Sequence, residues 1–211
     1  MKPRLILARH GNTFAPHETP VWVGARSDLP LVPSGLAQAE SLAQALKKAS
    51  FQPSVLATGP LQRTRQMAQI AAQRLGFPSD QIRVDSRLKE IDYGAWEGKT
   101  TAETEQLWGR EAVEAWTRNS LFPPGAGWQP SAAHIEEKAQ EILKESVAER
   151  ALYVTSGGIL RFFGRLAVNT QDFPDLKVGT GHVCVMEPEG KEFWRILAWN
   201  QLPEFLKPLD F

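Results

Sequence analysis

The sequence predicts an α/β fold: a three-layer α/β/α domain with a mainly parallel central sheet. Two features of the 211 residues predict it. Short apolar runs, typical of strands buried on both faces, alternate along the chain with longer segments of helical periodicity. Two of these runs continue directly into a helix-forming segment, as happens where helices cover both faces of a parallel sheet. Because no repeat or linker interrupts the pattern, we expect one domain over residues 1–211.

The apolar runs place the strands. The first, from Leu5 to Ala8, is continuous rather than alternating, which indicates burial on both faces. The last two runs surround Pro188-Glu189-Gly190, and this pattern predicts a β-hairpin. The expected strands lie at 5–8, 53–58, 81–88 (a short one), 151–156, 182–187 and 192–200.

The helical segments are bounded by caps and breakers. Ser34 is the expected N-cap of the first helix, Pro60 lies near the first turn of the second, and Gly76 ends it. Residues 100–118 have a helical pattern and precede a loop rich in proline and glycine, so about 100–133 form an expected elaboration over the C-terminal edge of the sheet. The expected helices lie at 33–49, 60–76, 100–118, 131–149 and 157–168.

The bulk composition excludes several classes of partner. Twenty-four basic residues balance twenty-four acidic ones, so we expect neither nucleic acid nor an anionic membrane as a partner. No apolar stretch approaches the roughly 20 residues of a membrane span, and the basic start lacks the apolar run of a signal peptide, so we expect a cytoplasmic protein. Cys184 is the single cysteine, and the sequence has no metal-binding or nucleotide-binding motif; we expect no metal and no cofactor.

Polar residues follow three of the expected strands. Arg9-His10-Gly11 ends the first, Thr58 to Arg63 ends the second, and Thr155 to Gly158 ends a later one. Ligands of such sheets bind beyond the carboxyl ends of the strands, where two helix N-termini would converge with Arg9 and Arg63 on an anion of the size of a phosphoryl group. A largely neutral imidazole, that of His10, has a free lone pair there and is suited to nucleophilic attack.

Five stretches occur in one order and resemble a known family. They are ARHGNT, RSDLPLVPSG, GPLQRTRQMA, LKEIDYGAWEG and VTSGGILR. Their order and spacing are similar to those of the histidine phosphatase (phosphoglycerate mutase-like) superfamily, and the resemblance covers nearly the whole chain. It implies that His10 becomes phosphohistidine and that Arg9 and Arg63 bind phosphate. It implies further that Glu90 protonates the leaving oxygen, and that Asn12, Arg26 and Gly157 contact phosphate or substrate. Asp92 and Glu97 are rival acids; for Glu97 we favour a structural role in its turn.

The chain departs from the family pattern at two places. Ser156 stands where the family typically has a second histidine, which donates to the phosphoryl oxygens. Loss of one such donor lowers kcat by on the order of 10²–10³, so we expect slow turnover. His182 could fill the gap or could be an ordinary strand-edge histidine. The stretch FPPGAGW replaces polar residues of relatives, and its Trp128, with three further tryptophans, either forms an apolar lid or packs the elaboration onto the core; the three are Trp22, Trp108 and Trp116.

The function that follows is hydrolysis of a small phosphorylated metabolite through a phosphohistidine. Two alternatives stay open: phosphoryl transfer of the phosphoglycerate mutase type, and a catalytically impaired protein that binds phosphorylated ligands. The sequence leaves the identity of the substrate and the choice between monomer and homodimer undetermined.

Overall fold

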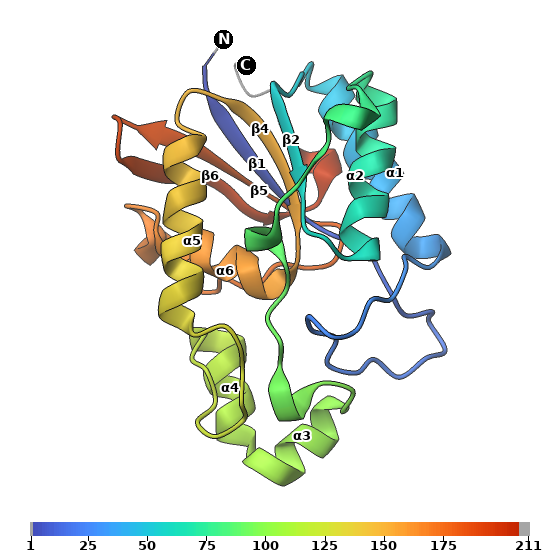
Figure 1. Cartoon of the computed structure of the whole chain (residues 1–211), viewed down its shortest axis with the longest axis vertical. Helices are drawn as coiled ribbons and strands as arrows, with labels where there is room; N and C mark the ends of the chain where they lie inside the picture. Colours follow the sequence, from blue (N-terminus) through green and yellow to red (C-terminus); the bar gives the residue numbers. More distant parts are fainter. Residues whose placement is uncertain (1, 207–211) are drawn as a thin grey trace.

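The computed structural model describes residues 2–206 and contains a six-stranded sheet with the order β3-β2-β4-β1-β5-β6. The first four strands in that order are mutually parallel, while β5 runs antiparallel to β1 and β6 antiparallel to β5. The mainly parallel sheet is therefore confirmed, with the late hairpin added at one edge (Figure 1). The strands are β1 (Arg4–Arg9), β2 (Val55–Thr58), β3 (Arg83–Val84), β4 (Arg150–Thr155), β5 (Val183–Glu189) and β6 (Phe193–Gln201).

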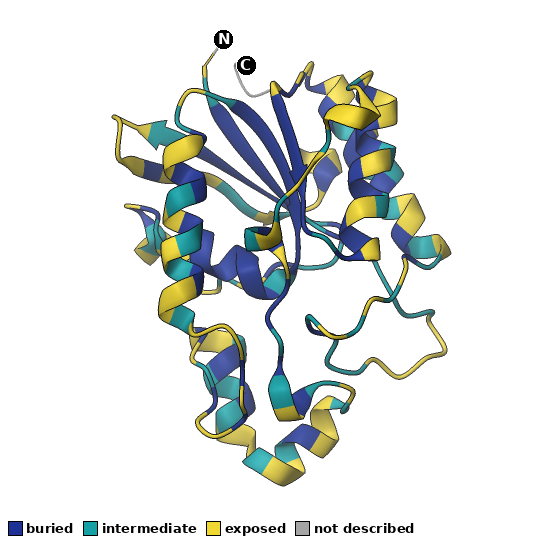
Figure 2. Cartoon of the chain, viewed as in Figure 1, coloured by how far each residue is buried: buried dark blue, intermediate teal, exposed yellow. Residues whose placement is uncertain are grey.

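Helices cover both faces of the sheet. Successive side chains of β1 alternate between two cores: Ile6 packs with α1 and α2, and Leu5 and Leu7 pack with α5 and α6. Because each face is covered, the central strands β1 and β4 are buried along their length except for Arg9, which is half-buried at the end of β1 (Figure 2). The helices are α1 (Pro33–Lys48), α2 (Gln62–Leu75), α3 (Thr101–Trp108), α4 (Arg110–Asn119), α5 (Ala132–Glu145) and α6 (Gly157–Arg165).

The helices expected at 131–149 and 157–168 end earlier, at Glu145 and Arg165, and two further differences have a clear structural cause. Helix α1 begins at Pro33 with Val32 as its N-cap, so Ser34 lies inside the first turn; its hydroxyl instead accepts from the side-chain amide of Asn12, at 3.2 Å. The expected helix at 100–118 is two helices, because Gly109 adopts φ of +84° between α3 and α4. The expected Gly76 stop of α2 is confirmed, with φ of +70°.

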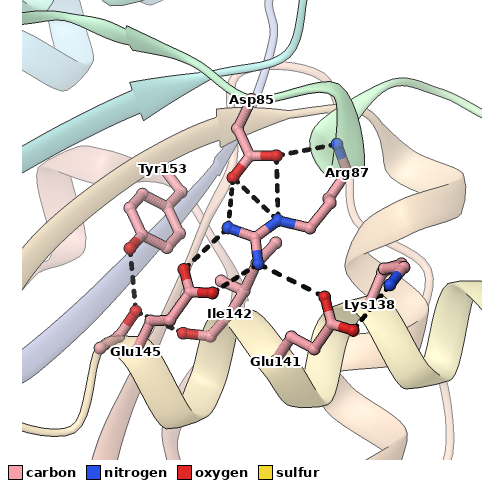
Figure 3. A network of polar contacts seen from close by, with 8 residues as sticks. Asp85, Arg87, Lys138, Glu141, Ile142, Glu145 and Tyr153 are labelled. Carbon is pink, nitrogen blue, oxygen red and sulfur yellow. Dashed lines mark hydrogen bonds and ion pairs between the residues drawn. The ribbon is translucent and has the colours of Figure 1, made fainter.

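The expected strand at 81–88 has two residues and then ends in a turn. Asp85 accepts the amide of Arg87 at 2.9 Å and so caps a short 3-10 turn, Ser86–Leu88. The Arg87 guanidinium also contacts Asp85 and Glu145, both at 2.7 Å, and Glu141 at 3.6 Å (Figure 3). We call these residues, with Lys138, the Arg87 cluster; it fastens the segment that leads to Glu90 onto α5.

Helices α3 and α4 and the loop that follows lie beyond the carboxyl edge of the parallel strands, as expected for the elaboration (Figure 1). Trp128 in that loop is buried and makes edge-to-face contacts with Tyr93, Trp96 and Trp116, with ring centroids 4.7–5.0 Å apart. This tryptophan packs the elaboration onto the rest of the fold. Within residues 2–206, no helix combines the length and apolar character needed to cross a bilayer.

Candidate active site

A cavity of about 910 Å³ lies at the carboxyl edge of the sheet, between the strand ends and the elaboration. Five of the residues predicted from the sequence line it: Arg9, His10, Asn12, Glu90 and Gly157. Arg63 lies directly behind His10 and is fully buried. The strand-end residues that the sequence predicted to converge therefore meet at one place.

The position of His10 is set by the end of β1. Its backbone amide donates to the carbonyl of Thr155 in the neighbouring strand β4, at 3.0 Å. Its ring nitrogen Nδ1 lies 2.8 Å from the carbonyl oxygen of Gly11, which can only accept, so Nδ1 carries the proton. The other nitrogen, Nε2, accepts from Nε of Arg63 at 3.2 Å. The ring is thus held as the tautomer whose lone pair is on Nε2, where it accepts the hydrogen bond from Arg63.

Burial lowers the pKa of His10 well below its ordinary value, and the charges of Arg9 and Arg63 lower it further. The hydrogen bond to Gly11 opposes this shift. The imidazole is consequently neutral at pH 7, which is the form that a nucleophile requires.

Arg63 is held by backbone carbonyls rather than by carboxylates. It enters near the first turn of α2, and its Nη1 and Nη2 donate to the carbonyls of Ser27 at 2.6 Å and Gly24 at 3.1 Å. The loop that supplies these carbonyls is itself anchored, because the Ser27 hydroxyl donates to Glu97 at 2.7 Å. Glu97 therefore has the structural role that we favoured from the sequence.

Arg9 has an unused donor at the site. Its Nη1 donates to the carbonyl of Val178 at 2.5 Å, but its Nε is buried and has no hydrogen-bond partner among the described residues. A Cβ at Gly157 would lie 3.0 Å from this Nε, so the glycine allows α6 to approach the guanidinium closely.

Glu90 is buried opposite the arginines. Its Oε1 accepts from the amide of Ile91 at 2.9 Å and its Oε2 from the amide of Gly158 at 3.2 Å. Burial raises its pKa, although these amides and the charges of Arg63 and Arg9 act against the shift. The carboxyl group therefore holds a proton at higher pH than an ordinary glutamate, as a general acid must.

The charge at this end of the cavity is unbalanced. Neither Arg9 nor Arg63 forms an ion pair with a carboxylate in residues 2–206, and Glu90 carries its charge less readily than usual. Asp28 also acts on Arg63 through space, but its carboxylate is hydrogen-bonded to the amide of Gln62 at 2.6 Å. Two cations without an ion-paired carboxylate, next to a carboxyl group whose charged form is disfavoured by burial, make a site for an anion.

Ser156 lies at the foot of α6, as its N-cap residue, and is fully buried. Its hydroxyl makes no capping hydrogen bond and has no partner among the described residues. The position at which the resemblance predicts a second histidine is therefore next to Gly157, which lines the cavity, but Ser156 itself does not line it and its hydroxyl is unused.

Three sequence-based expectations need correction. His182 turns its Nδ1 to the carbonyl of Asn200 at 3.1 Å and does not line the cavity, so the strand-edge alternative is the right one. Its backbone carbonyl, not its ring, serves the site, by accepting the amide of Arg9 at 3.0 Å. Arg26 is exposed and pairs with Asp92 and Glu97, both at 3.1 Å, outside the cavity.

The third expectation, that two helix N-termini converge on the site, also needs correction. Helix α6 presents Gly157 and Gly158 to the cavity, but the first amide of α2 is occupied by Asp28. One helix N-terminus, rather than two, therefore lines the cavity. Asn12 does line it, with its side chain held between the hydroxyls of Ser34 and Thr180.

Sequence reasoning missed many of the lining residues, among them the polar residues Tyr93 and Arg161. Tyr93 contacts Glu90, and burial raises the pKa of its hydroxyl well above the ordinary range, so it stays a donor. Arg161 is four residues after Gly157 in α6, a spacing that places both on one helix face and was available as a signal. Among the described residues, no three histidine, cysteine or acidic side chains gather as metal ligands would.

Known proteins resemble this chain in sequence and in fold. A profile of the histidine phosphatase superfamily (branch 1) matches residues 5–202. The chain belongs to this superfamily. A 2,3-bisphosphoglycerate-dependent phosphoglycerate mutase of Methylocella silvestris is 28% identical over 185 residues, which are 84% of this chain and 88% of that protein. The enzyme of the same name from Bartonella bacilliformis is 31% identical over 127 residues, 60% of this chain.

The matched segment spans 61% of the Bartonella enzyme and 50% of the similarly named Bifidobacterium longum enzyme. Among solved structures, a mycobacterial glucosyl-3-phosphoglycerate phosphatase aligns with a TM-score of 0.78 at 22% identity, over 95% of this chain and 99% of that one. Alpha-ribazole phosphatase of Shigella flexneri aligns with a TM-score of 0.70 at 20% identity, over 94% and 96% of the two chains. These histidine phosphatases share the fold of this chain.

Proposed function

We propose that this histidine phosphatase is a phosphomonoester hydrolase that acts through a phosphohistidine at His10. The observation that carries the proposal is the tautomer of His10. The Gly11 carbonyl holds the proton on Nδ1, so the lone pair that can attack is on Nε2, which gives up its hydrogen bond from Arg63 when it bonds to phosphorus. A neutral imidazole held among cations can attack an anionic phosphoryl group that those cations also attract.

In the first step, Nε2 of His10 bonds to phosphorus while the bond from phosphorus to the ester oxygen breaks. Glu90 gives its proton to that oxygen, and the alcohol leaves. Arg9 and Arg63 balance the charge on the three equatorial oxygens of the transferring group. The free Nε of Arg9 supplies one unused donor for these oxygens.

In the second step, water attacks the phosphohistidine. The Glu90 carboxylate takes a proton from the water, the bond from phosphorus to Nε2 breaks, and inorganic phosphate is released with His10 neutral again. Each residue thus returns to its starting state, and the same carboxyl group serves as acid and then as base.

The names of the sequence relatives favour a second candidate, phosphoryl transfer of the phosphoglycerate mutase type. In that reaction the phosphoenzyme returns its phosphoryl group to an organic acceptor rather than to water. Product analysis separates the two: hydrolysis releases inorganic phosphate in amounts equal to the alcohol, whereas transfer releases little.

The deciding experiment compares the wild-type chain with His10→Ala on 4-nitrophenyl phosphate, and looks for acid-labile phosphorylation of the wild type after rapid quenching. We expect turnover and label in the wild type and neither in His10→Ala. Equal rates for the two chains contradict the proposal. Phosphate that binds to the wild type without turnover of any phosphoester would support the ligand-binding alternative instead.

A further inference from the structure

The cavity has two chemically different ends. The inner end holds His10, Arg9 and Glu90, while much of the remaining wall is apolar or aromatic. Residues of that wall include Phe14, Pro20, Trp22, Tyr93, Val113 and Trp116. A volume of about 910 Å³ is far more than a phosphate ion fills, so this wall faces the leaving group of the substrate.

The aromatic part of the wall is held in place before any substrate binds. Tyr93 makes edge-to-face contacts with Trp22 on one side, at 5.5 Å between centroids, and with Trp116 on the other, at 6.1 Å. The backbone of Trp22 is tied on both sides, because its amide donates to Lys99 at 2.8 Å and its carbonyl accepts from Gly98 at 2.9 Å. A preformed aromatic surface binds a flat apolar group without losing side-chain entropy.

The charged residues of this outer wall balance in number, because Arg110, Arg161 and Lys177 are basic and Glu18, Glu105 and Glu114 are acidic. Arg110 pairs with Glu114 at 2.9 Å, and the Glu18 carboxylate accepts the amide of Ala15 at 2.5 Å. Nη1 of Arg161 already donates to the carbonyls of Trp116 at 3.2 Å and Thr117 at 3.0 Å, at the end of α4.

Glu105 and Lys177 add one charge of each sign to the wall. The surplus of positive charge is therefore confined to the inner end, where the phosphoryl group would bind. A second phosphate or a carboxylate on the leaving group would meet no such surplus.

We infer that the substrate is a phosphomonoester with one phosphate and an uncharged, flat, apolar leaving group, selected by Trp22, Tyr93 and Trp116. The inference rests on the proposed hydrolase function and narrows its substrate class. It excludes from the preferred class those phosphoesters whose leaving group carries a carboxylate or a second phosphate.

The test compares esters whose alcohols have similar acidity, so that leaving-group chemistry does not decide the result. Benzyl phosphate is the apolar ester, glycerol 3-phosphate the neutral polar one, and phosphoserine and 3-phosphoglycerate the charged ones. We expect kcat/KM for benzyl phosphate to exceed that for each of the others by about tenfold to a hundredfold, the range that apolar pocket contacts supply.

Two tryptophan variants locate the selectivity. Trp22 and Trp108 are both half-buried and both contact Trp96, at 5.0 and 6.2 Å, but only Trp22 lines the cavity. Trp22→Ala should lower kcat/KM for benzyl phosphate about tenfold, mainly through KM, with less than threefold change for glycerol 3-phosphate. Trp108→Ala should leave the ratio between the two esters unchanged, and thermal melts of both variants identify any loss of folding.

Binding of benzylphosphonate and methylphosphonate, followed by tryptophan fluorescence, tests the same wall without turnover. Tighter binding of benzylphosphonate supports the inference, and equal binding contradicts it. If His10-dependent hydrolysis occurs but charged esters equal or exceed benzyl phosphate, the inference fails while the proposed function holds. If no ester is hydrolysed, the proposed function fails, and the two phosphonates then decide the inference alone.

Discussion

Arg87 in its cluster and the two arginines at the His10 site have different kinds of partner. Arg87 forms ion pairs with three carboxylates, those of Asp85, Glu141 and Glu145 (Figure 3). Arg9 and Arg63 form none within residues 2–206 and are held by backbone carbonyls instead. We therefore expect Arg87 to stabilise the fold and Arg9 and Arg63 to bind a ligand. The comparison predicts which arginine matters for turnover and which for stability.

The largest effect on turnover should come from Glu90, the carboxyl group that lies at the cation-rich end of the cavity. Glu90→Gln removes the proton donor, and general acid catalysis contributes about 10²–10⁴-fold. Benzyl phosphate needs this proton because its alcohol leaves poorly, while 4-nitrophenolate leaves without it. We expect kcat/KM, which reports only the first step, to fall by that factor for benzyl phosphate and much less for 4-nitrophenyl phosphate; equal losses for the two esters would argue against Glu90 as the acid.

The next effect separates the two kinds of arginine directly. Arg9→Met removes a preorganised donor and cation and should lower kcat/KM by about 10²–10³, with weaker inhibition by phosphate or vanadate. Arg87→Met is the matched control, because it removes a cation of the same size from the cluster. Its kcat/KM should stay within about threefold of the wild type, far less than the loss of a charge-stabilising donor causes. Steady-state kinetics of the two variants side by side make this measurement.

A smaller effect is expected at Ser156, which is buried directly before the cavity residue Gly157. Ser156→His adds back a charge-assisted donor and should raise kcat about tenfold or more. Ser156→Ala removes a hydroxyl that has no partner among the described residues, so it should change the free energy of unfolding by less than about 1 kcal/mol. No gain in rate with histidine, in a variant that folds normally, would mean that the site is repurposed rather than impaired.

The smallest effect is on stability, in the Arg87 cluster. Arg87→Met should lower the free energy of unfolding by about 1–2 kcal/mol, a modest value because several of its carboxylates are exposed and screened by water. The pKa of Glu145 is lowered by its hydrogen bonds to Arg87, and the pKa of Glu141 by Lys138 and then Arg87. Their contribution is present above their ordinary pKa of 4.5 and is lost as pH falls through the lowered values.

The His10 site loses stability in a different range of pH. Because burial lowers the pKa of His10, its contribution is present above the ordinary value of 6.5 and is lost as pH falls through the lowered value. Denaturant unfolding from pH 7 to pH 3 should therefore show two losses, the first absent in His10→Gln and the second reduced in Arg87→Met. A single loss that neither variant alters would contradict this assignment.

The sequence alone predicted the α/β class, the parallel strands, the late hairpin and the strand-end residues His10, Arg9 and Arg63, whereas Glu90 came only from the resemblance to the superfamily. It could do so because strand periodicity and the strand-end position of polar residues are local properties that a parallel sheet converts into proximity. The five motifs of the superfamily strengthened the same residues. Ser34 as a cap and a single helix at 100–118 were wrong, since tertiary contacts and one glycine torsion decided those boundaries.

Tertiary structure decided what each polar group does. His182 and Arg26 are residue types that occur in phosphate sites. Here His182 contacts the carbonyl of Asn200, and Arg26 pairs with Asp92 and Glu97. Arg161 enters the cavity where its bonds to Thr117 and Ser120, more than 40 positions away, dock α6 against α4. Tyr93 enters it between Trp22 and Trp116, which come from two other segments. The pattern of a sequence predicts the strand end or helix face on which a side chain lies. The groups that hydrogen-bond to that side chain come from distant segments, which the pattern does not show. The tertiary structure is therefore needed to distinguish Arg87, which we expect to stabilise the fold, from Arg9 and Arg63, which we expect to bind an anion.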